Sequence, residues 1–203
     1  MTFDEALNPY VRLVKSHPLI IRDCQEAFDF FVGKKSIVDL GCGNGHFLAS
    51  YLEKNSTLSG LGVERRFKRS FRTAEKLENL PALVLQTDVN DFLSLCPSNF
   101  WDEIWMQFPD PWPKDRHEKN RMLTSAFLRD IRRVLKPGGR FCFRSDCQAY
   151  WEFLQIQNVR ANLFPIVKSL KGDLFIDEPE TLFQRKFFKL AVPIYSLEAR
   201  LVD

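Results

Sequence analysis

The sequence predicts an α/β protein whose mostly parallel sheet is covered by helices on both faces. Two observations predict this class: short apolar segments alternate with amphipathic segments over residues 36–144, and a glycine-rich turn follows the first apolar segment. Alternation of this kind indicates consecutive β-α-β units with buried parallel strands. A chain of 203 residues can bury one sizeable core. We therefore expect a single domain over 1–203, in which 35–203 form the core and 1–34 a helical extension.

The expected elements follow one another in a regular order. Residues 17–32 have apolar positions at helical spacing and predict a helix ahead of the sheet. The alternation then predicts five strands, at 36–40, 58–63, 82–86, 101–108 and 140–144, and three helices, at 46–54, 65–78 and 123–135. Segments 173–176 and 186–194 predict an antiparallel pair that completes a seven-stranded sheet, where Pro193 confines its strand to an edge or an end. Ligands of such sheets bind outside the carboxyl ends of the strands, so we expect the turns after the first four strands to share one cleft.

Composition excludes several classes of protein. The five cysteines form no CxxC pair and the chain has only three histidines, so we expect neither a disulfide framework nor a metal site. Residues 1–15 lack the apolar region of a signal peptide, and no uninterrupted apolar stretch could cross a bilayer. We expect a soluble, cytoplasmic protein without a membrane partner.

Positive charge is concentrated in two segments, although the formal net charge is only +3. The first basic segment, 65–76, contains Arg65, Arg66, Lys68, Arg69, Arg72 and Lys76. The second basic segment, 114–140, contains Lys114, Arg116, Lys119, Arg121, Arg129, Arg132, Arg133, Lys136 and Arg140. Two such segments in a nearly neutral chain indicate a polyanionic partner, and two solvated helix faces are an equally good interpretation.

The turn after the first strand is rich in glycine. It reads DLGCGNG, with Gly41, Gly43 and Gly45 spaced as G-x-G-x-G. Glycines permit a tight turn and let a ligand approach the backbone, and the helix that follows presents free N–H groups. A dinucleotide-binding fold would have G-x-G-x-x-G at this place, so the spacing favours a different nucleoside ligand.

Acidic residues close three successive strands beside this turn. Asp39 ends the first strand, where its carboxylate would repel a pyrophosphate but could accept from an ammonium group through water or backbone. Glu64 follows the second strand, about 20 residues past the glycines, where an acid bonds ribose hydroxyls. Asp88 follows the third, where it could meet the exocyclic amine of adenine. This set fits S-adenosylmethionine, a sulfonium cation without phosphate, better than NAD. A helix-dipole role for Glu64 and an N-cap role for Asp88 are the alternatives.

The fourth strand runs into a proline-studded loop with the sequence FPDPWPKDRHEKNR, residues 108–121. Alternate prolines fix φ and stiffen the loop, so that Asp110 and Trp112 are held in set directions. An acid, an aromatic ring and a string of cations on one stiff loop suit the binding of a base and its phosphates. A surface loop with Trp112 packed in the core is the alternative.

The run PDPWPKDRHEKNR closely resembles the bacterial-type tRNA (guanine-N(7)-)-methyltransferase family. The resemblance extends over most of the chain, through DLGCGNG, GVE at 62–64, Asp88, RSD at 144–146 and TLFQ at 181–184. It implies a Rossmann-like methyltransferase fold, S-adenosylmethionine as cofactor and tRNA as partner. It also implies that the methyl acceptor is N7 of a guanosine in the variable loop (tRNA position 46).

The resemblance also implies roles for individual residues. Cofactor contacts are implied at Asp39, Glu64, Asp88 and Asp110, with the turn glycines Gly41, Gly43 and Gly45, and Asp110 is the implied catalytic residue. Substrate contacts are implied at Lys114, Asp146, Thr181, Phe183 and Gln184, and RNA-backbone contacts at Arg116, Lys119 and Arg121. One residue departs from the family pattern, because Gln184 stands where a glutamate is usual. A neutral amide cannot give the bidentate grip of a carboxylate on a guanine edge.

Guanine N7 carries a free lone pair at neutral pH, so methyl transfer needs alignment and exclusion of water rather than a general base. Donor–acceptor matching predicts that Asp110 and Asp146 hold the guanine N1 and N2 hydrogens. The alternatives are a methyltransferase of the same fold with another substrate, and a non-catalytic RNA-binding relative, which only Gln184 favours. Both a monomer and a homodimer are compatible with the sequence.

Overall fold

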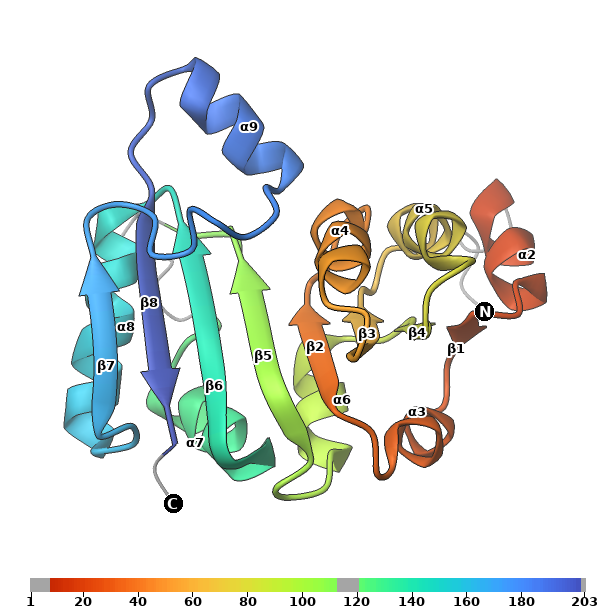
Figure 1. The fold of residues 1–203 in the computed structure, drawn as a ribbon, viewed down its shortest axis with the longest axis horizontal. Helices are drawn as coiled ribbons and strands as arrows, with labels where there is room; N and C mark the ends of the chain where they lie inside the picture. Colours follow the sequence, from red (N-terminus) through yellow and green to blue (C-terminus); the bar gives the residue numbers. More distant parts are fainter. Residues whose placement is uncertain (1–7, 113–120, 202–203) are drawn as a thin grey trace. The chain divides into compact units, whose positions relative to one another are not determined.

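The computed structural model describes residues 8–112 and 121–201 (Figure 1). The chain divides into two compact units, Met1–Leu95 and Cys96–Asp203. Each unit combines strands with helices, as the alternating sequence predicts.

The first unit contains a parallel sheet with the strand order β1-β4-β3-β2. Its strands are β1 (Ile20–Ile21), β2 (Ser36–Leu40), β3 (Ser59–Val63) and β4 (Ala82–Leu85). Every residue of these strands is buried, which is why their sequences are short apolar runs without alternation. The register pairs Leu40 with Val63 and Val63 with Leu85. The carboxyl ends of the three longer strands therefore align at one edge of this sheet.

Helices of the first unit connect and flank these strands. They are α2 (Pro9–Ser16), α3 (Cys24–Phe31), α4 (His46–Lys54), α5 (Phe67–Leu77) and α6 (Val89–Leu95). The side chains of Asn8 and Asp23 accept backbone N–H groups at the starts of α2 and α3, so the first turns are capped as such residues favour. Helix α5 buries a stripe that includes Thr73 and Ala74 and leaves a charged face outside.

The second unit has the strand order β5-β6-β8-β7. Strands β5 (Trp101–Gln107) and β6 (Leu135–Ser145) are parallel, whereas β8 (Tyr195–Arg200) runs antiparallel to both β6 and β7 (Ile166–Leu170). Its helices are α7 (Ser125–Val134), α8 (Gln148–Ala161) and α9 (Leu182–Lys189). Figure 1 shows α9 beyond the carboxyl ends of β5 and β6.

Most predicted elements are present, with ends that differ by a few residues. The predicted 36–40 strand and 46–54 helix match β2 and α4 in full. The predicted helix over 17–32 is wrong in its first half, because Ile20 and Ile21 pair with β4 before α3 begins. This short strand brings the described strands to eight, one more than predicted.

The predicted antiparallel pair of 173–176 with 186–194 is also wrong. The antiparallel strands are β7 and β8, and most of 186–194 belongs to α9 and the turn after it. Thr181 and Gln184 form a capping box that starts α9, and a capping box favours a helix over a strand. Pro193 lies before β8. The strand therefore loses no ladder hydrogen bond, although proline has no backbone N–H.

Candidate active site

The glycine turn after β2 has a backbone that favours glycine at three positions. Gly41, Gly43 and Gly45 have φ values of 77°, 59° and 74°, in the left-handed region that side chains rarely adopt. A Cβ on Gly45 would lie 2.6 Å from Cγ2 of Thr73, a residue of α5. The hydroxyl of Thr73 also donates to Gly43 O at 2.9 Å. Helix α5 therefore holds the turn from one side, an interaction that glycine spacing alone does not reveal.

Two buried carboxylates lie at the strand ends next to this turn. Asp39 is 2% exposed and Glu64 is 6% exposed. Burial and, as the smaller cause, the nearby charge of Glu64 raise the pKa of Asp39 to about 7. One oxygen of Glu64 accepts from the backbone N–H of Arg66 at 2.8 Å. Within the described residues neither acid has an ion-pair partner, so this end of the first sheet suits a cation.

Asp88 lies in the turn between β4 and α6 and is partly exposed. Its Oδ1 accepts from the backbone N–H of Asn90 at 2.9 Å and from the Asn90 side chain at 3.0 Å. These are contacts typical of a residue that starts a helix. Asp88 therefore makes the contacts of an N-cap residue, and its contact with adenine stays a prediction.

The described start of the proline loop, residues 108–112 of the second unit, has strained backbone at two positions. Phe108 has φ 48° and Trp112 has φ 44°, and such values are uncommon for side chains other than glycine, asparagine and aspartate. Trp112 is 39% exposed, so its ring is not packed in the core. Between them Asp110 is exposed. Asp110 and Trp112 are thus both exposed, and their contact with a base stays a prediction.

Arg121, the last residue of this loop, contacts the loop backbone at Trp112. It is buried, its Nε donates to Trp112 O at 3.3 Å, and its guanidinium lies 5.1 Å from the centre of the Phe153 ring. These contacts give Arg121 a structural role, and its contact with the RNA backbone stays a prediction. Lys114, Arg116 and Lys119 lie outside the described residues.

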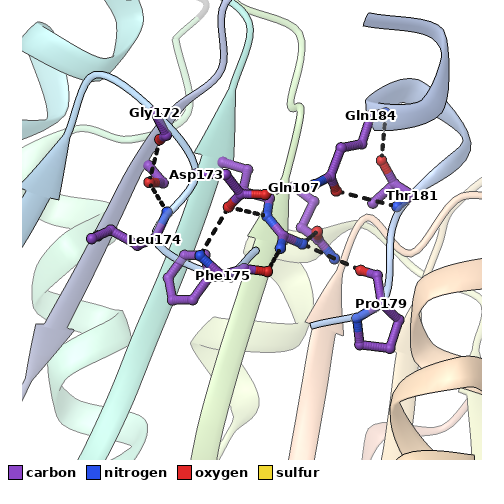
Figure 2. A network of polar contacts seen from close by, with 10 residues as sticks. Gln107, Gly172, Asp173, Leu174, Phe175, Pro179, Thr181 and Gln184 are labelled. Carbon is purple, nitrogen blue, oxygen red and sulfur yellow. Dashed lines mark hydrogen bonds and ion pairs between the residues drawn. The ribbon is translucent and has the colours of Figure 1, made fainter. Parts of the chain in front are cut away.

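Arg144 is the centre of a buried polar network in the second unit. Figure 2 labels its partners Gln107, Asp173 and Phe175. Its guanidinium is fully buried in β6. Nε donates to Asp173 Oδ1 at 3.0 Å, Nη1 to Gln107 Oε1 at 2.8 Å, and Nη2 to Phe175 O at 2.6 Å. Asp173 in turn accepts from Nε2 of Gln184. The sequence patterns assign no role to Gln107, Arg144 or Asp173. An arginine inside the apolar run FCFRS could have indicated a buried charge that needs hydrogen-bond partners.

The segment 181–184 begins α9 and is anchored to this network. Thr181 Oγ1 accepts from the backbone N–H of Gln184 at 2.9 Å, and Gln184 Oε1 accepts from Thr181 N at 3.4 Å. Gln184 is 1% exposed, whereas the neighbouring Phe183 is 49% exposed. The Phe183 ring lies 6.3 Å from that of Phe108 at the start of the proline loop. Asp146, two residues past Arg144, is partly exposed.

The second basic segment supplies fewer exposed charges than its composition indicates. Arg133 pairs with Asp130, Lys136 with Asp102, and Arg140 with both Glu103 and Glu198, at distances of 2.7 to 3.2 Å. Exposed cations in the described part of the chain include Arg65, Arg66, Lys68, Arg129 and Arg132. Part of the predicted polyanion-binding charge therefore stabilises the second unit instead.

Metal sites and membrane spans are both absent from residues 8–112 and 121–201. No group of three or more His, Cys, Asp or Glu residues in these ranges could hold a metal ion. None of the helices in these ranges is long and apolar enough to cross a bilayer.

Comparison with known proteins identifies the family. The family described as "Putative methyltransferase" matches residues 33–197. The tRNA (guanine-N(7)-)-methyltransferase of Lactobacillus gasseri is 30% identical over 185 residues, which cover 86% of this chain and 84% of that protein. The chain belongs to the tRNA (guanine-N(7)-)-methyltransferase family. A second relative of this name, from Lactobacillus helveticus, is 31% identical over 93% of this chain and 94% of its own.

Solved structures confirm the methyltransferase fold of this family member. The 16S rRNA methyltransferase KamB superposes with a TM-score of 0.67 at 15% identity, over 90% of this chain and 95% of that one. A 16S rRNA (adenine(1408)-N(1))-methyltransferase from Catenulisporales acidiphilia, solved with its cosubstrate SAM, superposes with a TM-score of 0.60 at 15% identity, over 90% and 93% of the two chains. The family and the fold class that the sequence predicts are thereby confirmed.

Proposed function

We infer that this chain transfers a methyl group from S-adenosylmethionine to N7 of a guanosine in tRNA. The observation that carries this proposal is the membership of the chain in this family. Its relatives are named tRNA (guanine-N(7)-)-methyltransferase, and they match this chain over most of their length. The proline loop with Asp110 and Trp112, by which the sequence resembles that family, is held by the fold with both residues exposed. The methyl acceptor would lie in the variable loop of a cytoplasmic tRNA.

The first unit supplies residues that fit the cofactor. Asp39 and Glu64 are buried acids without a cationic partner among the described residues. The ammonium group of the cofactor would supply that charge to Asp39, and Glu64 would accept from the ribose hydroxyls. The glycines at 41, 43 and 45 leave the turn backbone free of side chains where a nucleoside would approach. Asp88 completes the proposed cofactor contacts of this unit. When bound, S-adenosylmethionine supplies the electrophilic methyl group.

The second unit supplies residues that fit the guanosine. Asp110 and Asp146 carry carboxylates that can accept the N1 and N2 hydrogens of guanine, which leaves N7 unpaired. The exposed rings of Trp112 and Phe183 offer stacking surfaces for a base that is turned out of its own stack. Lys114, Thr181 and Gln184 belong to the same proposed substrate site, and Arg116, Lys119 and Arg121 to the RNA-backbone contacts.

The chemistry asked of these residues is alignment. The N7 lone pair is free at neutral pH, so no proton has to leave. The new N–C bond would form as the bond between the methyl carbon and the sulfur breaks, and the sulfur would leave as a neutral thioether. The residues need to hold N7 in line with the methyl carbon and sulfur and to keep water out, an effect that can supply several orders of magnitude in rate. Carboxylates that grip N1 and N2 would do this from the opposite edge of the base.

The proposal is tested with unmodified tRNA and labelled S-adenosylmethionine. The target guanosine is compared with 7-deazaguanosine, which has carbon in place of N7 and otherwise the same hydrogen-bonding groups. We expect labelling of the guanosine tRNA and none of the 7-deaza tRNA. Equal labelling of both would exclude N7. Calorimetry with S-adenosylmethionine alone would detect the RNA-binding alternative, because a protein that binds only RNA would give no heat.

A further inference from the structure

Both ends of the Gln184 amide are hydrogen-bonded inside the fold. Its Oε1 accepts from Thr181 N, and its Nε2 donates to Asp173 Oδ2. The side chain is 1% exposed. Because the side chain is buried, a direct contact between Gln184 and a base would require the amide to leave this position.

The charge of this network explains why an amide stands at position 184. Asp173 is an almost fully buried carboxylate whose ion-pair partner is Arg144, at 3.0 Å. Its Oδ1 also accepts from the backbone N–H of Phe175 at 3.0 Å. A glutamate at 184 would place a second carboxylate against Asp173, with one guanidinium to balance the two. The amide instead donates a hydrogen bond without adding charge, which leaves the buried pair neutral and satisfied.

Members of the network lie within three residues in sequence of Asp110, Asp146 and Phe183, which are proposed to hold the guanosine. Gln107, which accepts from Arg144 at 2.8 Å, precedes Asp110 by three residues in the sequence. Arg144 itself precedes Asp146 by two residues. Gln184 adjoins Phe183 and fixes the first turn of α9 through its capping box. Figure 2 shows Gln107, Asp173, Thr181 and Gln184 within this one network.

We propose that Arg144, Asp173 and Gln184 are positioning residues for guanosine recognition, and that Gln184 acts through α9 and does not contact the base. The inference rests on the proposed function, since it concerns the same site. Arg144 has a planar fork that can hold Gln107 and Asp173 at once. A shift of about 1 Å in a site of this kind can cost roughly a hundredfold in rate, so loosening the network is expected to impair methyl transfer even though every group that touches the substrate is still present.

The decisive variant is Gln184→Glu, which restores the usual family residue. At about pH 8 we expect a lower melting temperature and a kcat/KM for tRNA reduced by roughly tenfold to a hundredfold, with the Kd for S-adenosylmethionine unchanged. Both effects should diminish at about pH 6, because two adjacent carboxylates can share a proton and restore the missing donor. Gln25→Glu is the matched control, because Gln25 Nε2 donates to Asp29 Oδ1 at 2.8 Å on the exposed face of α3. A Gln184→Glu protein as active and as stable as the wild type at about pH 8 would overturn the proposal, because its carboxylate would then be free to serve the base.

Arg144→Lys keeps the inference testable if the first variant does not fold. Lysine retains the charge but removes the fork, so we expect a raised KM for tRNA and a lowered kcat per folded molecule, with unchanged cofactor affinity. A purely structural role would lower the melting temperature and leave these kinetic constants unchanged, which would overturn the inference. Arg160→Lys on the exposed end of α8 is the control.

The results also distinguish this inference from the proposed function. Wild-type protein that leaves tRNA guanosine unmethylated would overturn the proposed function itself. Wild-type activity together with unaffected variants would overturn this inference alone.

Discussion

Individual acids in this protein differ sharply in their surroundings, and their expected roles differ with them. Asp39 is buried beside Glu64, while Asp110 is exposed on a stiff loop. A buried acid without a cation is suited to a ligand of opposite charge, because its ionised form is otherwise unfavourable. An exposed acid is suited to a substrate that arrives and leaves.

The pH dependence of cofactor binding should follow Asp39. Its pKa is raised to about 7 in the folded protein, so ionisation weakens folding as pH rises toward that value, and a bound cation restores that free energy. We therefore expect the affinity for S-adenosylmethionine to increase as pH rises through about 7, measured by calorimetry. The cofactor's own amino group titrates nearby, so Asp39→Asn is the reference. The same pH dependence in this variant would show that Asp39 is not the group responsible.

Asp110→Ala should affect the rate more than the cofactor. If Asp110 holds the base, its removal should lower kcat for tRNA methylation by about a hundredfold, while the Kd for S-adenosylmethionine changes by much less. Single-turnover kinetics with saturating cofactor measure the first quantity, and calorimetry the second. The assignment would be wrong if cofactor binding collapsed and the rate at saturation survived.

Among the elements, the glycine turn and α5 depend on each other. Strand β2 delivers the chain to the turn, and Thr73 of α5 both donates to Gly43 O and occupies the space beside Gly45. The turn is thus shaped by its own backbone preferences and by a helix about 30 residues further along. The start of α9 depends in a similar way on a distant contact, because Gln184 of its capping box donates to Asp173 in the buried Arg144 network.

Gly45→Ala and Gly33→Ala separate these two causes. Both glycines have a positive φ, of 74° and 72°, but an added Cβ meets Thr73 only at Gly45 and nothing within 4 Å at Gly33. Backbone strain alone should cost Gly33→Ala about 1 to 2 kcal/mol of unfolding free energy, and overpacking should cost Gly45→Ala about 1 to 3 kcal/mol more. Urea denaturation measures both values. Equal destabilisation of the two variants would mean that the contact with Thr73 contributes nothing.

At the scale of the whole molecule, the distribution of charge matters more than its sum. The net charge of +3 conceals exposed cations after β3 and on α7, while several other arginines and lysines are paired inside the second unit. Exposed cations that are free of carboxylates attract a polyanion most strongly, because the field of a paired cation is largely cancelled by its partner. Arg65 and Arg66, which follow Glu64, are therefore expected to contact tRNA phosphates.

Reversing these charges tests that expectation. The double change Arg65→Glu and Arg66→Glu should weaken tRNA binding, and it should reduce the slope of log Kd against log salt by about 0.7 to 0.9 for each phosphate that the protein no longer neutralises. Filter binding over a range of salt concentrations measures the slope. Arg160→Glu on α8 is the control for a general change in net charge. An unaltered slope in the double variant would place the RNA-binding surface elsewhere.

The sequence by itself determined the α/β class, the order of most elements, the family, and the residues at the strand ends. These features depend on local patterns, namely apolar periodicity, glycine spacing and the proline loop, which a linear chain displays directly. The C-terminal strands were predicted wrongly because the capping box of Thr181 and Gln184 outweighed the apolar pattern of 186–194.

Only the tertiary structure decided how those strand-end residues are held. Thr73 against Gly45, the buried Arg144 between Gln107 and Asp173, and the pairing of Arg140 with Glu103 and Glu198 all join residues about 30 or more positions apart. Such contacts arise when the chain folds and leave no periodic trace in the sequence. For the same reason Gln184, which in the sequence is a departure at a substrate position, becomes in the fold the neutral partner of a buried carboxylate.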